Sequence, residues 1–199
     1  MKKLFKIIIL LFIYKSTLSS ADEINNLEIE GMSVGSSLLN YITEQKITKL
    51  IKSPVTAWYP NKTFAVIGLK SKNFNIYDDV GIVIRPYDKN YKIYALEGTI
   101  YYKRNISQCR KDQEKISTDL KELFDKGTYK FLKNLNLDYI DDKTGESKVS
   151  YYDFYFKDNS AVRVICWDMS ESLNAIGRED SLAVAVNSKI FMDWIDDNM

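Results

Sequence analysis

The sequence predicts an α+β domain, in which helices pack on one face of an antiparallel sheet of five to six strands and one disulfide joins the two layers. Three observations lead to this prediction. Strand-like segments follow one another without a helix between each pair, which is typical of antiparallel sheets. Residues 105–126 have clear helical periodicity. The two cysteines of the chain lie one in that segment and one in a strand-like segment.

The first 21 residues have the ordered parts of a cleavable secretory signal peptide. Lys2, Lys3 and Lys6 precede an apolar run over 7–14, and small polar residues follow as far as Ala21. The apolar run is too short for a membrane-spanning helix, which needs roughly 20 residues. We therefore expect a signal peptide over 1–21 and a single α+β domain over 22–199, located in the bacterial periplasm or secreted.

The charge of the remaining chain is close to balanced. Without the four lysines of the first 21 residues, 24 basic residues face 27 acidic ones. Such a surface gives no reason to expect nucleic acid or an anionic membrane as a partner. No later segment is long and apolar enough to span a membrane, so we expect no membrane span.

The first half of the domain combines one helix with three strands. Apolar residues between 38 and 51 recur at helical spacing, and Ser53-Pro54 ends the helix because the residue before a proline avoids helical geometry. Strands are predicted over 63–69, 80–85 and 91–102.

The helix over 105–126 is the clearest element. Asn105 or Ser107 can cap its start, and Gly127 can accept the left-handed conformation that often ends a helix. Its apolar side carries Cys109, Ile116, Leu120 and Leu123. Residues 128–140 are ambiguous and could continue as a short helix.

Strands over 149–156, 161–167 and 182–186 and a helix over 188–196 complete the predicted domain. Alternation predicts which strand residues face the core: Tyr152, Phe154, Phe156, Val162, Val164, Cys166, Leu182, Val184 and Val186. For the hairpin we expect a three-residue loop over 158–160, with Asn159 at positive φ and Phe154 opposite Val164. This register also sets Tyr155 opposite Arg163 on the outer face.

Cys109 and Cys166 are expected to form a structural disulfide. Export would place them in an oxidising compartment. The alternatives are two buried thiols or a redox-active pair, but redox pairs favour a Cys-x-x-Cys spacing and these residues are 57 positions apart.

Histidine is absent from the chain, and this excludes several chemistries. Residues 31–35 match the Gly-x-Ser-x-Gly pattern of serine hydrolases, yet Ser33 would need a histidine as its base. We therefore interpret these residues as a turn that leads into a helix. The same absence removes zinc and haem sites built on histidine.

No metal or cofactor site is predicted. Residues 141–146 resemble a calcium loop only superficially, because Lys143 stands where a ligand should be, so we interpret them as a solvated turn. The phosphate-binding motifs GxxxxGK[ST] and GxGxxG are also missing. We expect no cofactor and name no catalytic residue.

One candidate binding surface remains. The alternation places Tyr151, Asp153, Tyr155, Arg163 and Trp167 on the outer face of the sheet. Aromatic and charged residues interleaved in this way can bind a sugar or a peptide. The alternative is that tyrosine packs well on half-exposed sheets and serves structure alone.

Four stretches of the chain carry a resemblance to known proteins. They are residues 29–41, Cys109, Cys166-Trp167-Asp168 and residues 180–184. Together they resemble a family of small exported proteins from AT-rich marine bacteria, and the resemblance implies a periplasmic location and a shared disulfide. The Gly-Met-Ser stretch also resembles small lipoproteins of the outer-membrane barrel-assembly machinery, although their lipid-anchor cysteine is missing here.

Two functional hypotheses follow. The first is a non-enzymatic periplasmic protein that binds a protein, peptide or glycan through its sheet face or loops. The second is a glycan hydrolase or lyase that works through carboxylates, since such enzymes need no histidine. A cleft with two carboxyl groups would favour the enzyme, and a shallow aromatic surface would favour the binding protein.

Overall fold

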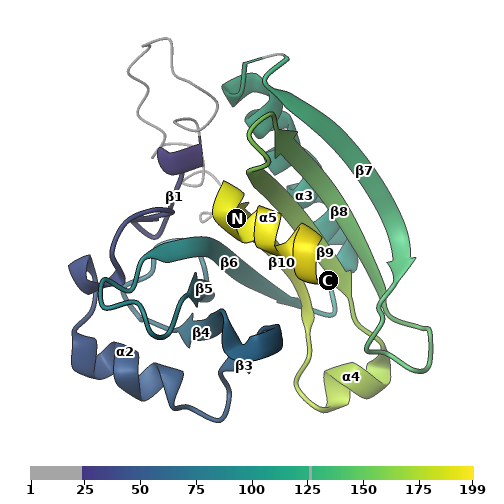
Figure 1. Ribbon diagram of the computed structural model, residues 1–199. Coiled ribbons are helices and arrows are strands. Elements are labelled where there is room, and N and C mark those ends of the chain that lie inside the picture. The colour runs from purple at the N-terminus through teal and green to yellow at the C-terminus, as the bar shows by residue number, and fades with distance from the viewer. Residues whose placement is uncertain (1–23, 126) are drawn as a thin grey trace.

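The computed structural model describes residues 24–199 except residue 126, so the predicted signal peptide lies outside the described residues. Its main feature is an eight-stranded antiparallel sheet with the strand order β3-β4-β5-β6-β10-β9-β8-β7 (Figure 1). The chain is therefore of the mixed α+β class, as predicted. The strands are β3 (Ala57–Trp58), β4 (Ala65–Leu69), β5 (Asp79–Ile84), β6 (Ile93–Lys103), β7 (Tyr129–Asp138), β8 (Lys148–Phe156), β9 (Ala161–Asp168) and β10 (Asp180–Asn187).

Shorter elements surround the sheet. A separate two-stranded hairpin pairs β1 (Glu28–Ile29) with β2 (Met32–Ser33). The helices are η2 (Leu38–Asn40), α2 (Glu44–Ile51), η3 (Pro60–Lys62), α3 (Ile106–Leu123), α4 (Glu171–Ala175) and α5 (Lys189–Asn198).

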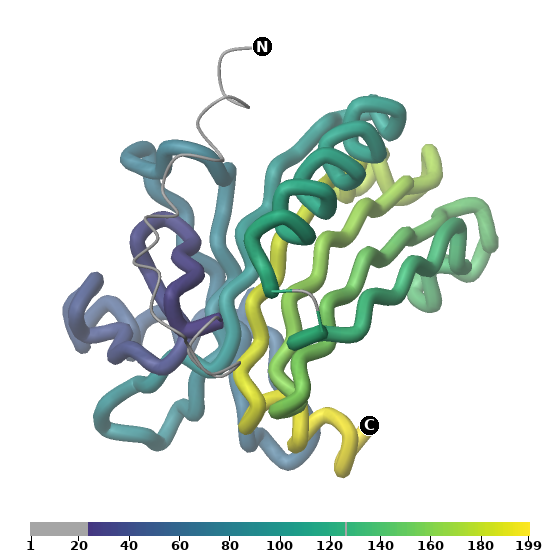
Figure 2. Tube along the Cα trace, turned by 90° about the horizontal axis from the view of Figure 1, so that it is seen from above, coloured from purple at the N-terminus to yellow at the C-terminus, as the bar shows by residue number. Residues whose placement is uncertain are grey.

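The sheet consists of two meanders that meet in its middle. β3 to β6 follow one another from one edge of the sheet to its centre. α3 then connects β6 to the opposite edge, where β7 begins the second meander. β7 to β10 return inward, so that the last strand pairs with β6 (Figures 1 and 2).

The first face of the sheet carries the main core and is covered by α3 and by the segment from Ile24 to α2. Its buried residues include all nine strand residues predicted to face the core. Cys109 of α3 and Cys166 of β9 lie in this core and form the predicted disulfide. Asn105 caps α3 by accepting a hydrogen bond from the Gln108 amide at 3.2 Å.

The prediction of five to six strands is wrong, because β3 and β7 were missed. β3 has only two residues. β7 occupies the ambiguous segment 128–140, where apolar residues at mixed spacing hide the strand alternation. A β-bulge between Asn134 and Leu137 shifts the pairing of β7 with β8, and it breaks the period of two that identifies strands.

The prediction that helices pack on one face is also wrong. α5 lies on the second face, opposite the face that α3 covers (Figure 1). The rings of Phe191 and Trp194 both contact Phe64 edge to face, with centroids 5.3 Å apart in each case. Aromatic residues on the outer side of β6 and before β4 thus give this helix a second, smaller core.

The predicted register of the β8–β9 hairpin is wrong by two residues. Phe154 pairs with Val162, and Arg163 pairs with Asp153 instead of Tyr155. The loop has three residues as expected, with Asn159 at φ 73°, but it spans 157–159. Asp158 fixes the turn there, because its Oδ1 accepts hydrogen bonds from both the amide and the hydroxyl of Ser160, at 3.0 and 2.6 Å. A shift of two residues keeps every side chain on its predicted face.

The predicted helices differ from the structure at their ends. The first region is divided into η2 and α2, because Thr43 caps α2 by accepting a hydrogen bond from the Lys46 amide. α3 ends at Leu123, before the predicted stop. Gly127 does take the left-handed conformation, with φ 93°, in the turn that follows.

Candidate functional site

The five residues of the predicted binding surface lie together on the second face of the sheet. We call the part of this face formed by β7 to β10 the open face. It includes the five candidates Tyr151, Asp153, Tyr155, Arg163 and Trp167 and their neighbours Leu132, Leu137, Val149, Ile165 and Ala183.

Arg163 holds the polar residues of the open face in one closed cluster. Its Nε donates to Asp153 Oδ1 at 2.6 Å, and its Nη2 donates to the Tyr155 hydroxyl at 3.0 Å. Its guanidinium also lies 4.9 Å from the centroid of the Tyr151 ring. Because only 4% of the Asp153 side chain is exposed, this carboxylate is paired internally and is not accessible to a ligand.

Lys130 and Asn134 of β7 and Ser181 and Asn187 of β10 also lie on the open face, and its remaining side chains are apolar or aromatic. Val149, Ile165 and Ala183 are 3%, 5% and 0% exposed, and half-buried Tyr151 and Trp167 pack against them. All five residues belong to strands, and among the described residues no apolar helix side chain belongs to this cluster. Antiparallel sheets commonly turn a polar face to water, and an apolar one typically marks an interaction surface.

The apolar surface continues to the edge of the sheet. Trp167, Val149 and Leu137 form a row across β9, β8 and β7. At this edge Leu135 and Leu137 are 49% and 44% exposed. The open face therefore has its most exposed apolar side chains on β7.

Sequence reasoning missed one carboxylate on the second face. Glu97 of β6 lies in a row of directly paired residues with Ala185, Arg163 and Asp153. Burial, and after it the nearby charge of Asp79, raise the pKa of Glu97 to about 7 against the opposing effect of the Arg163 charge. Its only sequence signal is a single charged residue among apolar and small neighbours in a long strand.

Asp79 provides the second carboxylate of this region. It pairs with Thr99, so it lies diagonally from Glu97 on the same face. Its Oδ2 accepts a hydrogen bond from the Tyr101 hydroxyl at 2.6 Å and lies 3.5 Å from Lys70 Nζ. A carboxyl that holds its proton near pH 7 therefore neighbours one with charge-stabilising partners, which is the arrangement that acid–base chemistry uses.

Ser33 lies in a different environment from a catalytic serine. β1 and β2 are joined by a two-residue turn in which Glu30 and Gly31 have φ values of 51° and 78°. Ser33 is part of this hairpin and not of a sharp turn between a strand and a helix. The geometry agrees with the interpretation of residues 31–35 as a turn.

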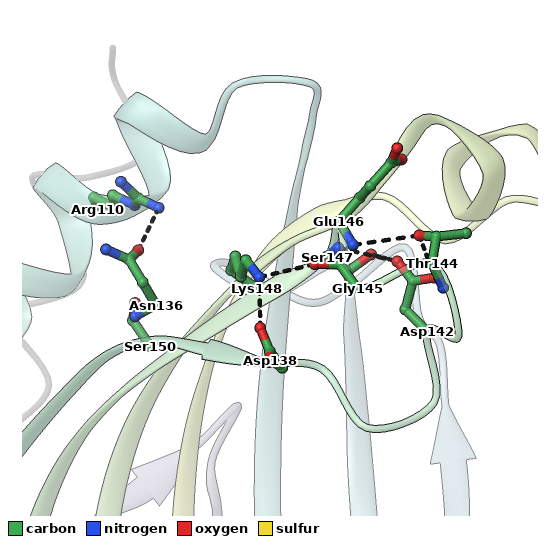
Figure 3. Close-up of polar contacts among 10 residues, drawn as sticks. All are labelled: Arg110, Asn136, Asp138, Asp142, Thr144, Gly145, Glu146, Ser147, Lys148 and Ser150. Atoms are coloured by element: carbon green, nitrogen blue, oxygen red, sulfur yellow. Dashed lines mark hydrogen bonds and ion pairs between the residues drawn. The ribbon is translucent and has the colours of Figure 1, made fainter.

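The loop between β7 and β8 is held by a buried aspartate (Figure 3). Asp142 Oδ1 accepts from the amide and hydroxyl of Thr144, and its Oδ2 accepts from the amide and hydroxyl of Ser147. These four hydrogen bonds hold the pKa of the Asp142 carboxyl well below its usual range. The loop is a turn as predicted, but its central carboxylate is buried and not solvated.

Two hollows lie outside the open face. One follows the exposed side of α2 from Glu44 to Pro54. The other, of about 500 Å³, lies between the segment near Ile24 and the start of α5. Among residues 24–199, residue 126 excepted, no three acidic or cysteine side chains group as metal ligands. Within the same residues, no helix has the length and apolar character to cross a membrane.

Comparison with known proteins identifies no relative: no protein-family model, no curated protein and no solved structure matches the chain.

Proposed function

We propose that the chain is an exported, non-enzymatic binding protein whose open face contacts a partner protein. The observation that supports this most directly is the apolar strand cluster, in which half-buried Tyr151 and Trp167 pack on three buried aliphatic side chains. The apolar side of α5 packs instead against the separate cluster around Phe64. Tyrosine, tryptophan and arginine are the residues most enriched at the energetic centres of protein interfaces.

A protein partner fits this surface better than a glycan. Binding of sugar hydroxyls requires free donors and acceptors, whereas Arg163, Asp153 and Tyr155 already bond to one another. Between this polar cluster and Leu137 on β7 lies aromatic and aliphatic surface, with Lys130 and Asn134 beside it at the edge. Such surface is buried favourably at about 25 cal/mol per Å².

The sequence pattern of residues 1–21 and the disulfide between Cys109 and Cys166 support the exported location. In this proposal the signal peptide directs the chain to the periplasm or outside the cell, and the resemblance to small exported proteins of marine bacteria agrees with that location.

Site-specific photo-crosslinking tests the proposal. A photoreactive phenylalanine analogue replaces Trp167 or Leu137, and Tyr87, which is 83% exposed in the β5–β6 loop, serves as the control position. In cells of the source organism, both open-face positions should yield the same discrete crosslinked protein, and position 87 should not. The purified partner should then bind Trp167→Ala at least about tenfold more weakly than the wild type, since interface aromatic anchors are worth about 2 kcal/mol or more.

Equal crosslinking from position 87, or none from the open face, would contradict the proposal. So would an unchanged affinity of Trp167→Ala for the purified partner.

A second candidate function is a carboxylate-based glycan hydrolase or lyase. The specific observation in its favour is Glu97, whose pKa of about 7 suits a general acid, on the same face as Asp79. Release of reducing ends from bacterial cell-wall glycans by the wild type, abolished in Glu97→Gln, would support the enzyme. If the wild type released no reducing ends, the hydrolase or lyase function would be excluded.

A further inference from the structure

β7 is the long free edge of the sheet. It has ten residues, whereas β3 at the opposite edge has two. All residues of β7 from Lys133 to Asp138 are exposed. A free edge presents a row of unpaired backbone donors and acceptors that another strand can use.

Three residues of β7 direct their backbone groups outward. The Phe156 amide donates to the Ser160 carbonyl at 2.9 Å, so Phe156 and every second residue of β8 before it bond toward β9. The alternate residues of β8 bond toward β7, where their partners are Lys130, Leu132 and Asn134. The backbone amides and carbonyls of Tyr129, Phe131 and Lys133 therefore point away from the sheet.

The far end of β7 is closed to a further strand by the bulge. Asn136 has φ 54°, and its amide donates to Ser150 Oγ at 3.2 Å (Figure 3). Arg110 of α3 donates to Asn136 Oδ1 at 2.9 Å and holds the bulge from the helix side. The regular part of the edge, which precedes the bulge, is Tyr129–Asn134, and among the described residues only β8 pairs with it.

The charge of this edge decides between a second copy of the chain and a different partner. Tyr129–Asn134 carries Lys130 and Lys133, and Lys121 of α3 lies beside it with Nζ 3.7 Å from the centroid of the Phe131 ring. Glu114 of α3 lies 3.2 Å from Lys133 Nζ and balances one of these three positive charges. Pairing of two copies along this stretch would bring four β7 lysines into one short interface, which is unfavourable. A strand with acidic side chains has the complementary charge.

We propose that the edge Tyr129–Asn134 accepts an added strand from the partner protein. The added strand places an apolar side chain beside Leu132 on the open-face side, where Lys130 and Asn134 flank it, and acidic side chains on the opposite side, beside Lys133 and Lys121. It extends the rows of the open face that contain Tyr151, Asp153 and Tyr155 by one strand. This inference rests on the proposed function, because it names how the partner docks at the open face.

Amide exchange measured by NMR tests the added strand directly. The probe is a ten-residue peptide of alternating valine and glutamate, with its valine–lysine counterpart as the control peptide. The acidic peptide should slow exchange of the Tyr129, Phe131 and Lys133 amides at least about tenfold, because each gains a hydrogen bond. The lysine peptide should leave all three unchanged. Unchanged exchange with the acidic peptide would overturn the inference.

A matched pair of variants separates backbone from side-chain effects. Lys133→Pro removes an outward amide that β8 does not use, and proline is tolerated at such an edge position. Lys133→Ala removes the same side chain and keeps the amide. Affinity for the acidic peptide, measured by fluorescence anisotropy, should fall at least about tenfold further in the proline variant than in the alanine variant. Equal affinities in two folded variants would contradict strand addition.

The two proposals can fail separately. If the Trp167 crosslink and the Trp167→Ala affinity behave as expected but the three amides stay unprotected, the open face binds the partner without strand addition. If the amides are protected but Trp167 is irrelevant, strand addition stands and the role of the open face fails.

Discussion

Replacing Glu97 by glutamine should change how the stability of the protein depends on pH. The pKa of Glu97 is raised in the folded protein from 4.5 to about 7, first by burial and then by the charge of Asp79. The unfolded chain loses this proton near pH 4.5, whereas the folded protein keeps it until about pH 7. Between these values the unfolded state binds fewer protons, so the stability contribution of Glu97 decreases as the pH rises.

The size of the effect follows from the shift in pKa. A shift of about 2.5 units corresponds to at most about 3–4 kcal/mol, at roughly 1.4 kcal/mol per unit. Glu97→Gln cannot ionise, so it should match the wild type near pH 4 and exceed it in stability above pH 7 by up to this amount. Other carboxyl groups titrate in both proteins and cancel in the difference.

Urea unfolding followed by tryptophan fluorescence measures the two stabilities from pH 4 to pH 8. Asp79→Asn provides a second check, because removing the neighbouring charge should lower the pKa of Glu97 and narrow the pH range of the effect. Parallel stability curves for the wild type and Glu97→Gln would refute the reasoning that places Glu97 in a desolvated site.

Four further outcomes are expected. Gly98→Ala should lower the free energy of unfolding in urea by about 1–3 kcal/mol, because the added Cβ would lie 2.6 Å from the Tyr77 ring. The Cβ added by Gly68→Ala meets nothing within 4 Å, so this variant should not show that loss. Equal losses in the two variants would refute the prediction. Phe154→Ala removes a fully buried ring and should cost about 3–5 kcal/mol, against less than about 0.5 for exposed Leu135→Ala; a loss below 1 kcal/mol at Phe154 would contradict the packing. Cys166→Ser opens a loop of about 58 residues and should cost about 4 kcal/mol, and two thiols alkylated without reductant in the wild-type protein would disprove the disulfide. Ser33 should stay unlabelled by a fluorophosphonate probe, since the chain has no histidine to activate it; a labelled Ser33 would reverse that interpretation.

The core faces of β8, β9 and β10 could be predicted from the sequence, because alternation with period two is a local property that burial of one face enforces. β7 could not, since its bulge at Asn136 breaks the alternation and its pairing with β8 is not visible in its own residues. The hairpin register failed for a related reason. Total apolar burial is similar in either register, and a side-chain bond from Asp158 to Ser160 selected between them.

The candidate surface was predicted in part. Alternation was enough to place Tyr151 and Trp167 on the outer face, but it could not show that Asp153 is enclosed by Arg163. Glu97 was missed because a lone glutamate in a strand usually faces water. Its desolvation depends on strands that are distant in sequence, including β9, which contributes Arg163.

The central position of β10 has a consequence for how the chain folds. This strand pairs with both β6 and β9 and follows both of them in chain order. A chain that emerges N-terminus first therefore holds two half-sheets, each with an unpaired inner edge, until β10 has been synthesised. Closure then depends on contacts that are distant in sequence, which form slowly. The two half-sheets can therefore join only when β10 pairs with both of them. A chain truncated before Asp180 would keep two separate half-sheets with unpaired, aggregation-prone edges and would not form one smaller domain.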